Sequence, residues 1–255
     1  MTQDDYCLKD RVALVTGAGT GIGRATALRL AQAGAFVGVH YHTSEAAAQE
    51  TLSTLRGNGG DGLLLQADIS DPTQAADLVD QLVAHTQRLD ILINNAGSPV
   101  ERQRLEDCPL ALWEKIIATN LTGAFRVTQK AIPYLRVSGH GSIVNNLTLS
   151  IQTGGANGAG PYAVAKGGLQ VMTRTLAREL APAVRTNAIM PGVIETPHHE
   201  VFTTEERMAQ YRRETPLERN GTADEVAAAI LFLASDASRF INGALLDING
   251  GRFLR

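Results

Sequence analysis

Short apolar runs rich in β-branched residues recur along the chain and alternate with longer stretches in which apolar residues follow a helical period. The runs expected to form strands are 12–16, 36–41, 63–67, 91–94, 142–146, 185–189 and 245–248. Helices are expected at 24–31, 45–55, 73–86, 112–135 and 162–180, the fourth passing through Asn120. This alternation predicts an α/β fold, a doubly wound parallel sheet of seven strands with helices on both faces.

The first apolar run, 12–16, leads into a glycine-rich turn and then into a helical stretch. Its glycines follow a GxxxGxG spacing, and the turn consists of Gly17, Ala18, Gly19, Thr20, Gly21, Ile22 and Gly23. Glycines let the backbone approach a ligand closely, and the free N–H groups at the start of the next helix attract a pyrophosphate. The turn therefore predicts a dinucleotide cradle, with a loop that merely reverses the chain as the alternative.

Tyr162 and Lys166 stand four residues apart in an expected helix, which stacks their side chains on one face. An ammonium beside a phenol favours the phenolate and lowers the tyrosine pKa from its usual value of about 10. A phenol tuned in this way suits proton exchange at an alcohol or a carbonyl. The competing interpretation of the pair is a solvated helix face.

Composition narrows the classes of partner. The chain has 255 residues and a formal net charge of −3, with both signs scattered, so it fits one large domain and argues against nucleic acid or an anionic membrane as partner. A small-molecule partner fits better.

The most apolar stretch, 227–234, is too short to span a bilayer, and the acidic start is no secretory signal, so a cytoplasmic protein is expected. Cys7 and Cys108 lack metal-ligand or redox spacing, and no metal site is expected.

Four candidate binding segments each follow an expected strand, namely the glycine turn, Asn94, Thr148 and Pro191. In doubly wound sheets, ligands bind beyond the carboxyl ends of the strands. The four segments are therefore expected to converge on one crevice.

Taken together, these motifs resemble the short-chain dehydrogenase/reductase family, particularly its 3-oxoacyl reductase branch. The family's marks are a TGxxxGxG turn, an NNAG segment, a catalytic asparagine and a YxxxK pair, here 16–23, 94–97, Asn120, and Tyr162 with Lys166. Family-like features at 68–69, 191–192 and 247–251 extend the resemblance over nearly the whole chain. The resemblance implies a single Rossmann-type domain over residues 1–255, NAD(P)-dependent oxidoreductase activity on a ketone or secondary alcohol, and a homotetramer.

The resemblance also implies catalytic roles. Tyr162 would exchange a proton with the substrate oxygen, while Lys166 would lower the phenol pKa and bind the nicotinamide ribose. Asn120 would interrupt its helix and hold a water in a proton relay to Lys166. Its alternative role is that of a local hydrogen-bonding residue.

The family's substrate-binding serine has no exact counterpart. Aligned from Gly141, the serine falls on Thr148, which keeps the hydroxyl but adds a methyl group that restricts χ1. Ser150 is the alternative, because residues two apart on an extended backbone point the same way. Thr148 is favoured, and a strand-end cap is its structural alternative.

The resemblance places the cofactor along most of the crevice. The predicted contacts are Gly17, Gly19, Gly21, Ile22, Gly23, Tyr41, His42, Thr43, Ser44, Asp68, Ile69, Asn94, Ala96, Gly97, Tyr162, Lys166, Pro191, Gly192, Ile194 and Thr196. Asp68 also fits a turn residue at a helix start, and both roles are compatible.

The end of the second expected strand decides between NAD and NADP, because a carboxylate there would bind the ribose 2′-OH and repel a 2′-phosphate. Tyr41 occupies that position, and His42, Thr43 and Ser44 follow it without an acid. NADP(H) is therefore preferred, with NAD(H) as the alternative.

Segment 195–217 resembles the family's variable substrate lid and contains His198, His199, Arg207, Arg212 and Arg213. These charges could meet an anionic substrate, but a solvated helix surface is favoured. The substrate itself is not readable from the sequence. A non-catalytic dinucleotide-binding sensor or scaffold is the alternative function, and Thr148 in place of serine is its only support.

Overall fold

A computed structural model describes residues 3–155, 157–197 and 203–254. Its seven-stranded sheet is parallel throughout, with the order β3-β2-β1-β4-β5-β6-β9. The strands are β1 (Val12–Val15), β2 (Phe36–Tyr41), β3 (Asp61–Gln66), β4 (Ile91–Asn94), β5 (Gly141–Asn146), β6 (Val184–Pro191) and β9 (Leu245–Ile248). All seven predicted strands are confirmed. A separate pair, β7 (Ile194–Glu195) and β8 (Gly221–Thr222), was not predicted.

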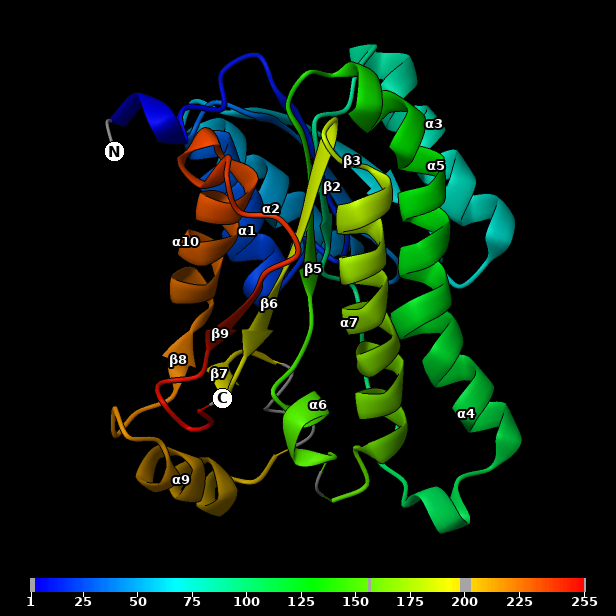
Figure 1. The fold of residues 1–255 in the computed structure, drawn as a ribbon, viewed down its shortest axis with the longest axis vertical. Helices are drawn as coiled ribbons and strands as arrows, with labels where there is room; N and C mark the ends of the chain where they lie inside the picture. Colours follow the sequence, from blue (N-terminus) through cyan, green and yellow to red (C-terminus); the bar gives the residue numbers. More distant parts are fainter. Residues whose placement is uncertain (1–2, 156, 198–202, 255) are drawn as a thin grey trace.

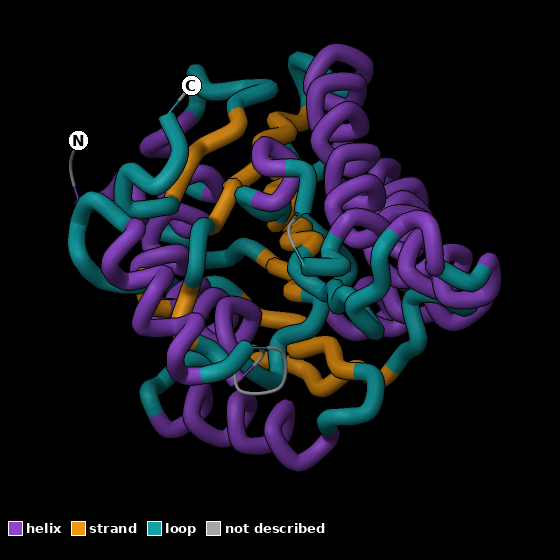
Figure 2. The backbone as a smooth tube through the Cα atoms, turned by 90° about the horizontal axis from the view of Figure 1, so that it is seen from below, coloured by secondary structure: helices purple, strands orange, loops and turns teal. Residues whose placement is uncertain are grey.

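Helices cover both faces of the sheet (Figures 1 and 2). One face carries α1 (Gly21–Gln32), α2 (Glu45–Gly57) and α10 (Ala223–Ala234), and the other carries α3 (Pro72–Thr86), α5 (Gly123–Val137) and α7 (Gly160–Glu179). Within the described residues the shorter elements are α4 (Leu110–Ile117), α6 (Ser150–Thr153), α9 (Glu205–Glu214), a π-helical turn (Ala118–Thr122) and 3₁₀ turns at Gln3–Tyr6, Leu105–Asp107 and Asp236–Ser238. Within the described ranges, no helix has both the length and the apolar character needed to cross a bilayer.

The sheet divides the apolar core into two layers. Successive strand residues point to opposite faces, so Ala13 and Val15 pack with the layer under α1, α2 and α10. Val12 and Leu14 pack with the layer under α3, α5 and α7. Strands buried on both faces read as continuous apolar runs, which explains why they were recognisable in the sequence.

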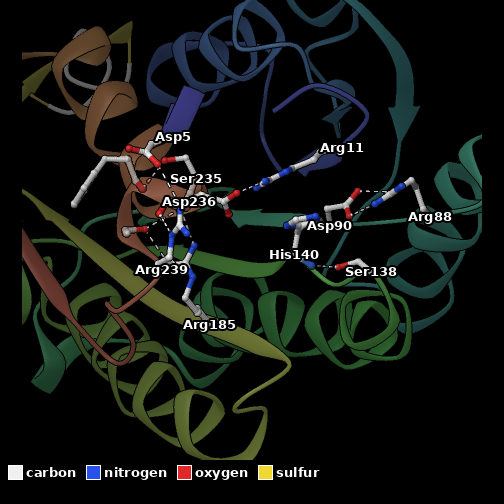
Figure 3. Close-up of polar contacts among 12 residues, drawn as sticks. Asp5, Arg11, Arg88, Asp90, Ser138, His140, Arg185, Ser235, Asp236 and Arg239 are labelled. Carbon is white, nitrogen blue, oxygen red and sulfur yellow. Dashed lines mark hydrogen bonds and ion pairs between the residues drawn. The ribbon is translucent and has the colours of Figure 1, made fainter. Parts of the chain in front are cut away.

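Ionic contacts, each with one buried partner, hold the amino ends of the central strands (Figure 3). Asp90, fully buried just before β4, accepts hydrogen bonds from the Val12 backbone N–H at 2.8 Å and from Arg88 Nε at 2.9 Å. Arg11, just before β1, pairs with Asp236 at 2.6 Å. These anchors lie at the amino ends of the strands. Ligands bind in this type of sheet at the opposite, carboxyl ends, beside the point between β1 and β4 where the strand order reverses.

Candidate active site

A cavity of about 980 Å³ lies at the carboxyl ends of the strands. The predicted site residues that line it are Gly17, Gly19, Gly21, Ile22, Gly23, Tyr41, His42, Thr43, Ser44, Asp68, Ile69, Ala96, Gly97, Thr148, Ser150, Tyr162, Lys166, Pro191, Gly192, Ile194 and Thr196. Asn94 and Asn120 are not among the lining residues. The fold thus brings almost the whole predicted set to one crevice from segments far apart in the chain.

The glycine turn is held against the end of β2 by His40, to which the sequence analysis gave no role. The Gly17 N–H donates to His40 Nδ1 at 3.0 Å, and His40 Nε2 lies 3.0 Å from the Ala67 carbonyl. Burial lowers the pKa of His40 to about 4, so the ring is neutral at neutral pH and Nδ1 can accept. A histidine within the apolar run 36–41 is the sequence signal that could have found it.

The start of α1 is open to a ligand. A Cβ on Gly23 would collide with the Gly17 carbonyl oxygen, so only glycine lets the helix begin directly against the turn. The N-cap residue, Thr20, makes no side-chain capping bond, which leaves the first N–H groups of α1 without a side-chain partner. A cradle of this kind fits the pyrophosphate of a dinucleotide.

A hydrogen-bond chain connects the glycine turn to Lys166. Asn95 Nδ2 donates to the carbonyl oxygens of Thr16 at 2.9 Å and Gly17 at 3.1 Å, and Asn95 Oδ1 accepts from Asn146 Nδ2 at 2.9 Å. Lys166 Nζ donates to the Asn146 carbonyl oxygen at 2.8 Å. Asn95 and Asn146 were not among the predicted site residues, although both line the cavity.

Asn94 does not reach the cavity, contrary to the predicted ribose contact. Its side chain is buried and Nδ2 donates to Thr128 Oγ1 and to Asn145 Oδ1, each at 2.8 Å. These bonds turn the amide into the core, where it braces β4 against β5 and α5. Asn95, the next residue, takes the cavity side instead.

Asn120 lies in the π-helical turn between α4 and α5, so the predicted interruption of this helix is present. The side chain is fully buried, and Nδ2 donates to the carbonyl oxygens of Ile116 at 2.9 Å and Ser98 at 2.7 Å. Oδ1 accepts from the Ser98 N–H at 2.9 Å. The amide therefore satisfies a carbonyl at the irregular turn and fixes the segment that follows the NNAG motif.

Gly97 passes between Asn120 and Lys166. A Cβ at this position would lie 2.6 Å from Asn120 Oδ1 and 3.0 Å from Lys166 Nζ. Because only a glycine fits between them, the backbone of the NNAG segment can run directly beside the Lys166 ammonium.

Tyr162 and Lys166 lie one turn apart near the start of α7, with Nζ 5.9 Å from the centre of the phenol ring. Burial raises the pKa of Tyr162 to about 12 and lowers the pKa of Lys166 to about 8. Desolvation of the buried ring is the cause of the Tyr162 shift, so the expected lowering of the phenol pKa by Lys166 is not seen in the protein alone. At neutral pH the phenol therefore carries a proton that it can donate, and Lys166 is still mostly charged.

Thr148 and Ser150 both line the cavity, but the backbone between them is not extended. β5 ends at Asn146, Leu149 has helical dihedral angles, and α6 begins at Ser150. The geometric premise for Ser150 is thus absent. Thr148 Oγ1 accepts a hydrogen bond from the Ser150 N–H at 3.2 Å, which leaves the hydroxyl proton able to donate to a substrate.

Asp68 caps its own turn at the other end of the cavity. Its Oδ1 accepts from the Ser70 N–H at 2.9 Å and from Ser70 Oγ at 2.7 Å. The second oxygen, Oδ2, lies 3.9 Å from His42 Nε2. The turn role of Asp68 is therefore present, and the residue still faces the cavity.

Comparison with known proteins connects this geometry to a large group of enzymes. Residues 17–252 match the family described as enoyl-(acyl carrier protein) reductase. The chain is 38% identical over 249 residues to the 3-oxoacyl-[acyl-carrier-protein] reductase of Thermotoga maritima, covering 96% of this chain and 98% of that protein. It is 35% identical to the versicolorin reductase of Emericella nidulans, covering 99% of both. A 7α-hydroxysteroid dehydrogenase solved with NADH and 7-oxo glycochenodeoxycholic acid superposes with a TM-score of 0.93 at 29% identity, covering 98% of this chain and 97% of that one.

The lowered pKa of Lys166 predicts a pH limit on carbonyl reduction. The group loses its charge as the pH rises through about 8, well below the ordinary lysine value, so kcat/KM should fall above that pH. Lys166→Arg keeps a positive charge at every accessible pH and should move the falling limb upward. Rates measured from pH 6 to 10 at saturating NADPH check this. A flat profile, or a limb that Lys166→Arg leaves in place, would contradict it.

Proposed function

The chain belongs to the short-chain dehydrogenase/reductase family, and we propose that it works as an NADPH-preferring carbonyl reductase with Tyr162 as proton donor. As a member of this family it is an NAD(P)-dependent oxidoreductase, which transfers hydride between a nicotinamide cofactor and a ketone or secondary alcohol. One observation carries the proposal: a single cavity joins the glycine turn to Tyr162 and Lys166. Nothing in the site or the relatives favours the non-catalytic sensor or scaffold.

The proposed chemistry divides among a few residues. The reduced nicotinamide supplies the hydride when it is bound. Tyr162, whose raised pKa keeps the phenol protonated, gives its proton to the carbonyl oxygen, and the Thr148 hydroxyl donates a hydrogen bond to the same oxygen. Lys166 holds its charge beside the phenol and binds the nicotinamide ribose. Asn120 acts on the reaction through the backbone that it fixes at Ser98.

Nine further lining residues are proposed to hold the dinucleotide. Gly17, Gly21 and Gly23 with the open start of α1 would take the pyrophosphate, Asp68 and Ile69 the adenine, and Ala96 and Gly97 the inner ribose. The backbone of Ile194 and the hydroxyl of Thr196 would meet the nicotinamide carboxamide. Asn94 is omitted from this set because its side chain is turned into the core.

The preference for NADPH rests on the end of β2. Segment 41–44 carries no carboxylate, and the His42 side chain is 58% exposed. α2 begins directly afterwards, and its N-cap residue, Ser44, makes no side-chain capping bond. A 2′-phosphate could therefore meet hydroxyl groups and the free N–H groups of a helix start. One structural relative was solved with NADH, so the relatives do not decide the matter.

A homotetramer is proposed from the outer faces of α5 and α7. Phe125 on α5 is 46% exposed, Val164 and Val171 on α7 are 46% and 63% exposed, and Leu246 on the edge strand β9 is 37% exposed. Apolar side chains gathered on two long helices and a sheet edge support contact with further copies of the chain.

The proposed compartment is the cytoplasm, which the two free cysteines support.

The proposed cofactor preference is tested by Tyr41→Asp. A carboxylate at the end of β2 should repel the 2′-phosphate and accept hydrogen bonds from a ribose 2′-OH, so the variant should bind NADH more tightly than NADPH. Calorimetric titration of both cofactors measures the preference. Tyr41→Phe is the matched control and should still prefer NADPH. Tighter binding of NADH by the wild type, or an unchanged preference in Tyr41→Asp, would contradict the proposal.

The proposed reduction is tested by following NADPH absorbance with ketones, sugars and acyl thioesters. The wild type should reduce at least one class, and Thr148→Val, which keeps the shape of the side chain but removes the donor, should lower kcat on that substrate by about 10²-fold. Ser150→Ala should cost less. Losses in the reverse order would assign the oxygen-binding hydroxyl to Ser150, and NADPH binding without turnover of any class would contradict the enzymatic proposal.

A further inference from the structure

Besides Tyr162 and Lys166, the cavity is lined by several positively charged side chains. The cavity is lined by three arginines, Arg102, Arg207 and Arg252, together with Tyr211. Of the two carboxylates among the described lining residues, Glu214 is the one that pairs with one of these arginines. The other acidic lining residue, Asp68, belongs to the adenine end. Three arginines against one glutamate give these lining residues a net positive charge.

Arg102 has no counter-charge from the described part of the chain. Its Nε is buried without a hydrogen-bond partner there, and the guanidinium enters no ion pair with residues 3–155, 157–197 or 203–254. The neighbouring Gln103 N–H donates to the Gly158 carbonyl oxygen at 2.9 Å, which fixes this segment beside the loop that leads to Tyr162. A partly buried, unpaired cation is costly, and an anionic ligand would relieve that cost.

Arg207 and Arg252 pack on the same aromatic ring. Their guanidinium carbons lie 5.3 Å and 4.4 Å from the centre of Tyr211, and Arg207 Nε donates to the Tyr211 hydroxyl at 2.5 Å. Arg252 pairs with Glu214, but its Nη1 is buried without a partner in the described residues. The ring therefore contacts two like charges, and one Arg252 nitrogen has no partner among the described residues.

The loop before α7 brings these arginines to the reacting end of the cavity. The Asn157 amide contacts the Arg207 guanidinium, and the adjacent Gly158 contacts the Arg102–Gln103 backbone. α7 begins at Gly160, only two residues before Tyr162. Arg102 and Arg207 thus flank one short loop that delivers the proposed proton donor.

The remaining cations of segment 195–217 differ in their surroundings. Arg212 is neutralised by Glu205 at 2.6 Å, and Arg213 is exposed and does not line the cavity. The expectation of a solvated surface is wrong for Arg207 and agrees with the placement of Arg213. His198 and His199 lie outside the described residues. Apart from Lys115 and Lys166, the lysine and arginine residues that line the cavity within the described ranges are therefore Arg102, Arg207 and Arg252.

We propose that these three arginines form a subsite for an anionic group, a carboxylate or a phosphate, carried by the carbonyl substrate. Guanidinium groups offer paired donors that match either oxyanion, and Arg102, Arg207 and Arg252 all line the cavity. The inference rests on the proposed function, because it takes the substrate to lie between this subsite and Tyr162. It narrows the substrate to acidic ketones or their alcohols.

A binding experiment tests the subsite without requiring turnover. NADP⁺-loaded protein is titrated by calorimetry with butanoate, hexanoate and octanoate, with the matching neutral amides, and with inorganic phosphate. At least one carboxylate, or phosphate, should bind at least about tenfold more tightly than the neutral amides, and Arg102→Gln should remove the difference. Arg213→Gln, which changes an exposed arginine of α9 that does not line the cavity, is the control and should change nothing. Equal binding of acids, phosphate and amides, or an equal effect of both variants, would overturn the subsite.

Turnover separates this inference from the proposed function. Methyl ketones ending in a carboxylate are compared with their methyl esters, and dihydroxyacetone phosphate with dihydroxyacetone. A charged member of one pair should have the lower KM, and Arg102→Gln should raise that KM about tenfold while the KM of its neutral partner stays constant. Reduction of charged and neutral members with equal KM would overturn the subsite and leave the reductase standing. Preferential binding of anions without reduction of any carbonyl would support the subsite and contradict the reductase.

Discussion

The hydrogen bond from Lys166 Nζ to the Asn146 carbonyl oxygen is the contact on which the arrangement of the site depends. It fixes a buried ammonium from α7 to the end of β5, and through the Asn146 and Asn95 side chains it reaches the glycine turn after β1. Proton donor and cofactor cradle therefore share one rigid framework. A buried cation is costly to desolvate, which appears here as the lowered pKa of Lys166. The proposed site is thus built around a charge that a purely structural core would not contain.

The sheet makes this concentration of polar groups possible. Its central strands are buried on both faces by apolar layers, and their amino ends are held by Asp90 and the Arg11–Asp236 pair. The carboxyl ends are left to the glycine turn, the NNAG segment and the Thr148 region, whose backbones need not continue a regular ladder. Stability and proposed function occupy opposite ends of the same strands, so loops can vary in the site without disturbing the anchors.

Local sequence pattern was enough for the strands, the glycine turn and the Tyr162–Lys166 pair, because each depends on residues close together in the chain. Which of Asn94 and Asn95 faces the cavity depends on how β4 packs against its neighbours, and the pattern does not contain that information. The sign of the pKa shift of Tyr162 required the burial of its ring. The arginine subsite unites residues 102, 207 and 252, which only the folded chain brings together.

The most direct test of the account is the turnover of Tyr162→Phe compared with its binding of NADPH. The variant loses only the phenol oxygen, so the glycine turn, the Lys166–Asn146 bond and the cofactor contacts of the other residues remain. We predict a fall in kcat of about 10²- to 10⁴-fold with NADPH affinity changed by less than about twofold. Turnover close to that of the wild type would contradict the central claim that Tyr162 supplies the proton.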